Sequence, residues 1–213
     1  MKITDNDRIL MIGAHPDDIE FGCGAIISKL KNKDRITCLT LSKMKNHKRT
    51  EYLVKEHYKS MNLLGITKDN IILKDFEERM FFKNRQDICD CLYDIYKEYN
   101  PSIVFCHPVY SDLHQDHEIT SKETLRIFRE TTIFGYQNQP RYYYEYCPNV
   151  FIQVSKKDVE NKAEALQSYI TYKDKGYFNP ELIISQLRSN GIVIGVEFAE
   201  AYHTSKLAIK DTI

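Results

Sequence analysis

The sequence has no excess of charge of either sign, because its 30 lysines and arginines balance its 30 aspartates and glutamates. This balance removes any whole-molecule electrostatic argument for a nucleic acid or an anionic membrane as partner. Long apolar runs are also missing: uncharged stretches such as Phe21–Ser28 and Pro101–Ser111 fall well short of the roughly 20 apolar residues of a membrane span. The mixed charges near the N-terminus do not form a secretory signal.

A CxxC pair is absent as well. The six cysteines are Cys23, Cys38, Cys89, Cys91, Cys106 and Cys147. Four of them lie within apolar segments, which is typical of free thiols in a reducing compartment. We therefore expect a cytoplasmic protein, with Cys89 and Cys91 as ordinary residues of an amphipathic helix rather than a metal site.

Length and composition are those of a globular protein. With 213 residues, 42% hydrophobic and 28% charged, the chain is neither collagen-like, nor a coiled coil, nor largely disordered. A chain of this length buries roughly 70% of its unfolded surface and needs no structural metal to fold. No internal repeat or linker interrupts it, so we expect one domain over residues 1–213.

Strand and helix patterns alternate through the first half. Short apolar or β-branched segments predict four strands: Arg8–Gly13, Arg35–Leu41, Ile71–Leu73 and Ser102–His107. Helical spacing of apolar residues predicts the intervening helices: residues 17–31, 53–64 and Gln86–Tyr99. The alternation predicts an α/β fold, a Rossmann-like, doubly wound, mostly parallel sheet with helices on both faces. In the order 3-2-1-4, strands 1 and 4 are neighbours.

The second half is less regular. We expect helices near residues 117–129, 156–170 and 180–189, strands at Tyr142–Tyr146 and Val150–Ser155, and a terminal apolar run, Gly191–Phe198. Gly22 and Gly24 do not complete a dinucleotide fingerprint, because the third glycine would fall at Ile27. A nicotinamide-binding module is therefore a poor interpretation.

Two clusters of ligand-type side chains follow strands 1 and 4. His15 and Asp18 lie three residues apart with Asp17 between them, and imidazole plus carboxylate is a pair that zinc accepts. The second cluster is Asp112-Leu113-His114-Gln115-Asp116-His117. Because the carboxyl ends of neighbouring parallel strands share one crevice, His15, Asp18 and either His117 or His114 come within reach of one metal ion. Three protein ligands and an open position describe a catalytic zinc site.

These residues resemble a known family. Ala14-His15-Pro16-Asp17-Asp18, followed by Phe21-Gly22-Cys23-Gly24, resembles the AHPDD signature of the LmbE/PIG-L family of zinc-dependent N-deacetylases. His114-Gln115-Asp116-His117 resembles the family's second motif, HxDH. Weaker similarity at Pro148-Asn149-Val150-Phe151 and Ala199-Glu200-Ala201-Tyr202 extends the resemblance over most of the chain. The two motifs together, in order and after the expected strands, are specific.

The resemblance implies one zinc ion and its three ligands: His15, Asp18 and His117. It also implies that Asp17 acts as general base and that His114 stabilises the oxyanion or helps as acid, with Asp116 orienting His114. From the residues alone, His117 and His114 remain equal candidates for the third ligand.

One position departs from the family's pattern. Many members carry an arginine one turn before a helix glutamate that shortly precedes Leu-Gly; aligning Glu56 with that glutamate leaves Leu53 in the arginine's place. Arg49 is then the candidate substrate-binding residue. The basic loop Lys43–Arg49 is either a solvated loop or a contact for the phosphate of a nucleotide-linked sugar.

We therefore expect a hydrolase that removes an N-acetyl group from an N-acetylated amino sugar, or from its glycoside or nucleotide-linked form. The expected partner is this small molecule, and the sequence is compatible with a homo-oligomer. Two alternatives stay open: a metal-binding, non-catalytic LmbE-like protein, and a hydrolase of another amide. Retention of Asp17 and His114, which zinc binding does not require, argues against the first.

Ordinary structural roles compete with each functional one. Either Asp17 or Asp18, taken alone, would most often cap a helix. His107 is expected to end a strand beside the site as a core histidine. His47, His57 and His203 are expected at the surface, since no partner for them is evident in the sequence. The tyrosines of residues 142–146 are expected to pack in a strand.

Overall fold

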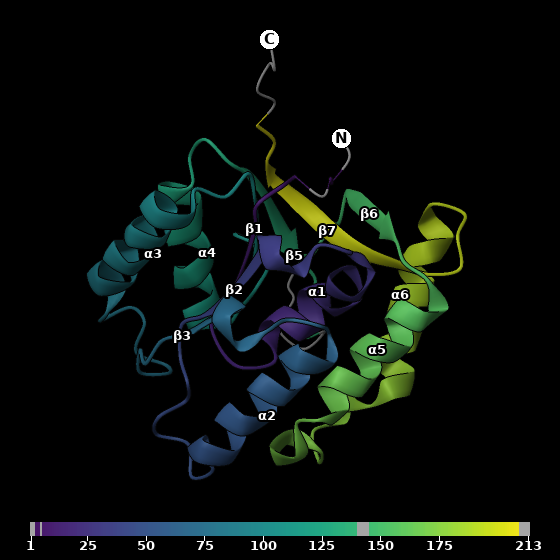
Figure 1. Ribbon diagram of the computed structural model, residues 1–213, viewed down its shortest axis with the longest axis horizontal. Coiled ribbons are helices and arrows are strands. Elements are labelled where there is room, and N and C mark those ends of the chain that lie inside the picture. Colours follow the sequence, from purple (N-terminus) through teal and green to yellow (C-terminus); the bar gives the residue numbers. More distant parts are fainter. Residues whose placement is uncertain (1–2, 5, 140–144, 209–213) are drawn as a thin grey trace.

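The computed structural model describes residues 3–4, 6–139 and 145–208. These residues form a seven-stranded sheet in the order β3-β2-β1-β4-β5-β7-β6 (Figure 1). The strands are β1 Ile9–Gly13, β2 Ile36–Thr40, β3 Ile71–Leu73, β4 Ile103–Cys106, β5 Thr132–Tyr136, β6 Val150–Gln153 and β7 Ala199–Lys206. Strands β1 to β5 are parallel, whereas β7 runs antiparallel to both of its neighbours. The predicted mostly parallel sheet and the order 3-2-1-4 are confirmed.

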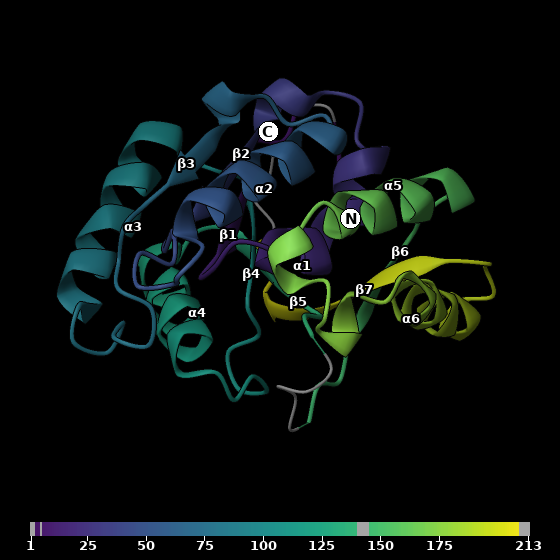
Figure 2. The same cartoon turned by 90° about the horizontal axis from the view of Figure 1, so that it is seen from below.

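Helices cover both faces of the sheet. They are α1 Asp18–Lys29, α2 Thr50–Leu63, α3 Arg85–Tyr99, α4 Gln115–Ile127, α5 Lys156–Gln167 and α6 Pro180–Val193. In Figure 2, α3 and α4 lie on one side of the sheet and α1, α2 and α5 on the other. Leu10 and Ile12 of β1 join the core beneath α3 and α4, while Ile9 and Met11 join the opposite core. Burial on both faces explains why the parallel strands are continuous apolar runs.

A buried ion pair fixes α1 against α5 and β7. The Nζ of Lys162 lies 2.7 Å from Oε1 of Glu200, and both side chains are almost fully buried. Glu200 also accepts hydrogen bonds from the backbone N–H groups of Ala25 and Ile26, and Lys162 donates to the carbonyl of Phe21. Each charge is thus paired and hydrogen-bonded, as burial requires.

Two glycines of α1 permit close packing. A Cβ on Gly22 would overlap the ring of Tyr136, and one on Gly24 would overlap the side-chain stem of Lys162. These glycines serve the contact of α1 with β5 and α5, not a nucleotide.

The second half departs from the predicted pattern. Strands β5 and β7 lie where the apolar pattern predicts none, and Gly191–Phe198 forms the end of α6 and the following turn instead of a further element. Most of the strand expected at Tyr142–Tyr146 lies outside the described residues; Glu145 and Tyr146, which are described, are not in a strand. Over the described ranges, every helix is too short or too polar to cross a membrane.

Candidate active site

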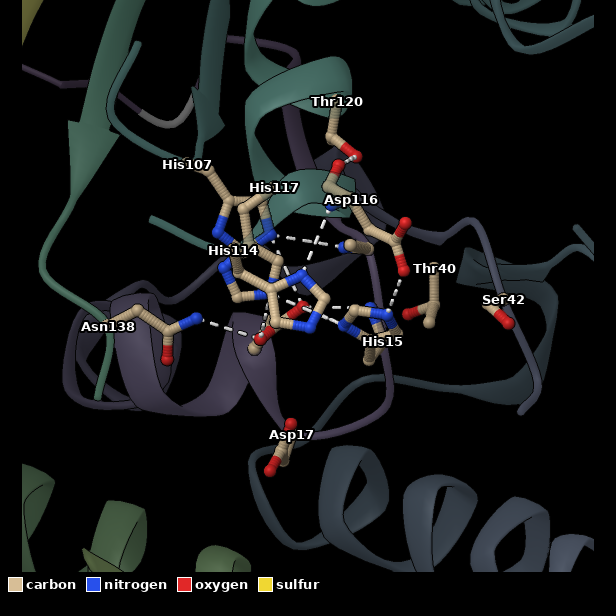
Figure 3. A network of polar contacts seen from close by, with 12 residues as sticks. His15, Asp17, Thr40, Ser42, His107, His114, Asp116, His117, Thr120 and Asn138 are labelled. Carbon is tan, nitrogen blue, oxygen red and sulfur yellow. Dashed lines mark hydrogen bonds and ion pairs between the residues drawn. The ribbon is translucent and has the colours of Figure 1, made fainter. Parts of the chain in front are cut away.

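The candidate site lies at the carboxyl edge of the parallel strands. β1 pairs with β4, so the segment after β1 meets the segment after β4, as predicted. Figure 3 shows His15 pointing toward His114 and His117, with Asp17 below the three histidines in this view. The residue after β5, Gln137, begins a segment that reaches the same edge.

Three side chains converge closely enough to share one ion. Nδ1 of His15 lies 3.3 Å from Nε2 of His117, and these nitrogens lie 3.6 and 3.5 Å from the two carboxylate oxygens of Asp18. Ligand atoms about 2.0–2.2 Å from a tetrahedral zinc ion are separated from one another by roughly 3.3–3.6 Å. Two imidazoles and a carboxylate at this spacing therefore fit a zinc-type metal.

Two carboxylates fix the histidine tautomers. Oδ2 of Asp116 accepts a hydrogen bond from Nε2 of His15 at 3.0 Å, and Oδ2 of Asp112 accepts one from Nδ1 of His117 at 2.7 Å. In a neutral imidazole, as metal binding requires, each bond puts the proton on the outer nitrogen and leaves the lone pair of the inner nitrogen facing the cluster. Such second partners are usual for metal-binding histidines. Asp112 was not assigned a role from the sequence, although it stands in the same acidic and histidine-rich segment.

His114 is engaged differently from His117. Its Nδ1 accepts the backbone N–H of Asp116 at 3.2 Å, so that His114 caps α4. Its ring stacks on His117 with centroids 4.3 Å apart. Burial and the charges of His117 and His15 lower the pKa of His114 to about 3, which leaves the ring neutral at pH 7. With Nδ1 as acceptor, the ring proton lies on Nε2.

The carboxylate of Asp17 is turned to the cavity. The residue is in the left-handed region with φ 96°, directly before α1, and its side chain makes no capping bond to α1, which lies wholly within the described residues. Its Oδ2 accepts a hydrogen bond from Nε2 of Gln139 at 3.4 Å. The ordinary role as a side-chain cap therefore does not apply to Asp17.

The two neighbouring aspartates have opposite electrostatics. Burial, and then the charge of Asp18, raise the pKa of the Asp17 carboxyl well above its ordinary value. Burial would also raise the pKa of Asp18, but the charges of His117 and His107 hold it well below its ordinary value. Asp18 therefore stays ionised to a lower pH than Asp17 does. Paired carboxyls with separated pKa values are typical of acid-base sites.

His107 follows β4 and is buried behind the cluster. Its Nε2 accepts the backbone N–H of Ala14 at 3.2 Å, and its ring stacks on His117 with centroids 3.8 Å apart. Nε2 also lies 3.2 Å from Oδ2 of Asp18, so Asp18, His107 and His117 form a second compact group of ligand-type atoms. The expectation of a core histidine beside the site is confirmed.

A small cavity of about 130 Å³ opens in front of these residues. Every parallel strand contributes to its lining through the segment that follows it, and Tyr172, Lys175 and Tyr177 complete the wall. Among the described residues that line the cavity, the basic side chains are those of Arg79 and Lys175. Arg49 is not part of the lining; its guanidinium lies over the ring of Tyr52.

His57 is fully buried, so the prediction that it lies at the surface was wrong. Its Nδ1 lies 2.8 Å from the hydroxyl of Tyr169, and its Nε2 lies 3.2 Å from Oγ1 of Thr40. Tyr169 in turn donates to Glu20, which is also fully buried. The partners come from β2, α1 and the segment after α5, and sequence separation hides such a network.

Comparison with known proteins identifies the family. The sequence pattern of the PIG-L family, described as GlcNAc-PI de-N-acetylase, matches residues 10–128 and so includes both ligand clusters. The chain belongs to the PIG-L family. This PIG-L protein is also 32% identical over 167 residues to the "Uncharacterized deacetylase YaiS" of Escherichia coli (strain K12), covering 76% of this chain and 89% of the relative. It is therefore a member of a deacetylase family.

Solved structures share the fold. The N,N'-diacetylchitobiose deacetylase from Pyrococcus horikoshii superposes with a TM-score of 0.77 at 19% identity, covering 93% of this PIG-L protein and 84% of that chain. GalB, the 4-carboxy-2-hydroxymuconate hydratase from Pseudomonas putida KT2440, superposes with a TM-score of 0.72 at 13% identity, covering 96% and 98%. Since one fold carries both reactions, the reaction must be argued from the side chains of the site.

Proposed function

We propose that this PIG-L protein is a metal-dependent hydrolase that removes the N-acetyl group of a small amino sugar. The observation that carries the proposal is the mutual spacing of His15, Asp18 and His117, 3.3–3.6 Å between ligand atoms, beside an Asp17 carboxylate that binds none of them. Membership of a deacetylase family supports the choice of an N-acetyl group as the target.

The metal ligands in this proposal are His15, Asp18 and His117. His117 is preferred to His114 because Asp112 directs its lone pair to the cluster, whereas Nδ1 of His114 caps α4. A divalent ion bound there, which we propose to be Zn²⁺, would acidify water and polarise a carbonyl oxygen.

Asp17 is the proposed general base. It accepts a proton from water as the water oxygen bonds to the acetyl carbonyl carbon. The raised pKa of Asp17 then suits it to return this proton to the leaving nitrogen as the C–N bond breaks. Acetate and a free amine result, and no further reactant is consumed.

His114 is the proposed oxyanion donor. Its Nδ1 is an acceptor and its low pKa keeps the ring neutral, so the N–H at Nε2 is available as a neutral donor near pH 7. Because the bond to α4 already holds the His114 ring in place, the donor loses little orientational freedom when substrate binds. This preorganisation favours stabilisation of the developing negative charge. Asp116 assists by holding His15 through its carboxylate and His114 through its backbone.

The side chains that line the cavity favour a sugar substrate. Tyr172 and Tyr177 offer ring surfaces, and Arg79 and Lys175 offer positive charge to a phosphate or carboxylate of a glycoside or nucleotide-linked sugar. Arg49, the substrate contact proposed from the sequence, would touch only a part of the substrate that extends beyond the cavity.

The test is a mass-spectrometric screen of free, glycosidic and nucleotide-linked N-acetylhexosamines for loss of one acetyl group by zinc-loaded protein. Asp17→Asn is the matched control, because it alters no proposed metal ligand. We expect acetyl loss with the wild type and little with the variant. A protein that binds zinc but deacetylates none of these compounds would instead support the non-catalytic alternative.

A further inference from the structure

Gln139 presents one buried carboxamide to the cavity. The residue is 4% exposed and lines the same cavity as His15, Asp17 and His117. It follows Asn138, whose Nδ2 donates to Oδ1 of Asp18 at 2.8 Å. The segment after β5 thus places one amide side chain against each of the two consecutive aspartates.

The two ends of the Gln139 carboxamide differ in their partners. Nε2 faces Oδ2 of Asp17 at 3.4 Å. Oε1 is buried and meets no hydrogen-bond donor among the residues that the structure describes. Buried carbonyl oxygens are rarely left in this condition, since the loss of hydration is not compensated. An acceptor of this kind on a cavity wall indicates a donor that arrives with the ligand.

The position of Oε1 restricts which donor this is. Oε1 and Nε2 are bonded to the same carbon of the Gln139 carboxamide, and Nε2 contacts Asp17, the proposed general base. Oε1 therefore lies beside the place where Asp17 would meet the reacting carbonyl group. The donor nearest to the carbonyl carbon of an acetamide is its own N–H, which is one bond away.

We propose that Oε1 of Gln139 accepts the N–H of the substrate's acetamide and so makes the site selective for amides over the corresponding acetate esters. This inference rests on the proposed deacetylase function. It gives Gln139 two functions: Nε2 restrains the Asp17 carboxylate, and Oε1 recognises the scissile amide. An ester presents an oxygen where the amide presents N–H, and leaves Oε1 without a donor.

The experiment compares an N-acetylated sugar with the sugar that carries an O-acetyl group at the same carbon. The ratio of kcat/KM for amide over ester is measured for zinc-loaded wild type and for Gln139→Met, which keeps the side-chain length and removes both polar atoms. Comparing the two proteins cancels the intrinsic reactivity of the ester. We expect Gln139→Met to lower this ratio by about 10–100-fold, the range for leaving a buried polar partner unpaired.

Two further variants separate recognition from positioning. Gln139→Glu keeps an oxygen acceptor but not the donor to Asp17, so it should slow both substrates while keeping a preference for the amide. Gln137→Met makes the same chemical change two residues earlier, where Oε1 accepts from Asn190 outside the cavity, and should leave the ratio unchanged. Bound zinc is measured in each variant to confirm an intact metal site.

The outcomes distinguish the inference from the function on which it rests. Equal losses on amide and ester in Gln139→Met would overturn the N–H contact and reduce Gln139 to a support for Asp17. The amide-over-ester ratio could also fall in Gln139→Met for a sugar with a neighbouring hydroxyl but not for its deoxy analogue. That result would overturn the N–H contact and show that Oε1 accepts from the hydroxyl. Absence of acetate release from every N-acetylated sugar by the wild type would overturn the proposed function itself.

Discussion

The Oδ2 atom of Asp116 lies 3.0 Å from Nε2 of His15, on the side of the imidazole opposite the nitrogen that faces Asp18 and His117. Asp116 therefore orients His15 through its carboxylate and donates its backbone N–H to His114. The same carboxylate accepts the backbone N–H of Arg79. One residue thus links the segment after β3, the segment after β1 and the start of α4.

Removal of this restraint should weaken metal binding. Asp116→Asn cannot hold the His15 ring through the same charged acceptor, so we expect zinc affinity to fall by about 10–100-fold. Asp90→Asn, on the exposed side of α3, is the matched control. Chelator competition measures both variants. An Asp116→Asn protein with unchanged zinc affinity would contradict the role of Asp116 in orienting a ligand.

Neutralising Asp17 should separate chemistry from metal binding. Asp17→Asn keeps the shape of the side chain but cannot take a proton from water, so we expect kcat to fall by about 10²–10⁴-fold. Bound zinc, measured by elemental analysis, should remain near the wild-type amount. Full turnover by this variant on a confirmed substrate would exclude Asp17 as the general base.

The sequence predicted the part of the site that is local in the chain. His15, Asp17 and Asp18 follow one strand and the segment 112–117 follows another, and the order of parallel strands is enough to bring them together. The contacts of Asn138, Gln139 and His57 depend on β5 and on the segment after α5, which no pattern in the sequence links to the metal cluster.

The same contrast holds for the fold. β1 to β4 are apolar and were found, whereas β7 carries Glu200, whose charge is hidden by Lys162 from a distant helix. Ile192 and Val193, at the end of α6 before β7, are 74% and 63% exposed. Hydrophobicity in this region therefore did not indicate where the strand lies. Burial of a paired charge and exposure of apolar residues are both consequences of tertiary structure.

The Lys162 and Glu200 pair should be important for stability. Lys162→Met removes one partner of a buried pair and leaves the Glu200 carboxylate uncompensated, so we expect the free energy of unfolding to fall by about 3–5 kcal/mol. Lys122→Met breaks the exposed pair with Glu118 and should cost less than about 1 kcal/mol. Urea unfolding measures both. Equal, small losses would show that Glu200 needs no counterion.

Arg79 should contribute more than Arg49 to the binding of a negatively charged substrate. Arg79 lines the cavity and Arg49 does not, so Arg79→Ala should raise KM for a phosphorylated N-acetyl sugar by about 10-fold relative to a neutral one. Arg49→Ala should leave the kinetics of a neutral monosaccharide unchanged. The comparison uses steady-state kinetics on the two substrates. If Arg49→Ala changed the kinetics of the neutral sugar more than Arg79→Ala changed the relative KM of the phosphorylated sugar, this account of the cavity would be contradicted.

The central claim, metal-dependent deacetylation at the His15, Asp18 and His117 cluster, is tested most directly by following acetate release through chelation and reloading. The measurement uses one N-acetylated sugar and the same protein sample before chelation, after chelation and after addition of one equivalent of zinc. The account predicts that acetate release is lost on chelation and restored by zinc in the wild type, but not restored in His117→Ala. Acetate release that survives chelation, or that zinc restores equally in His117→Ala, would contradict it.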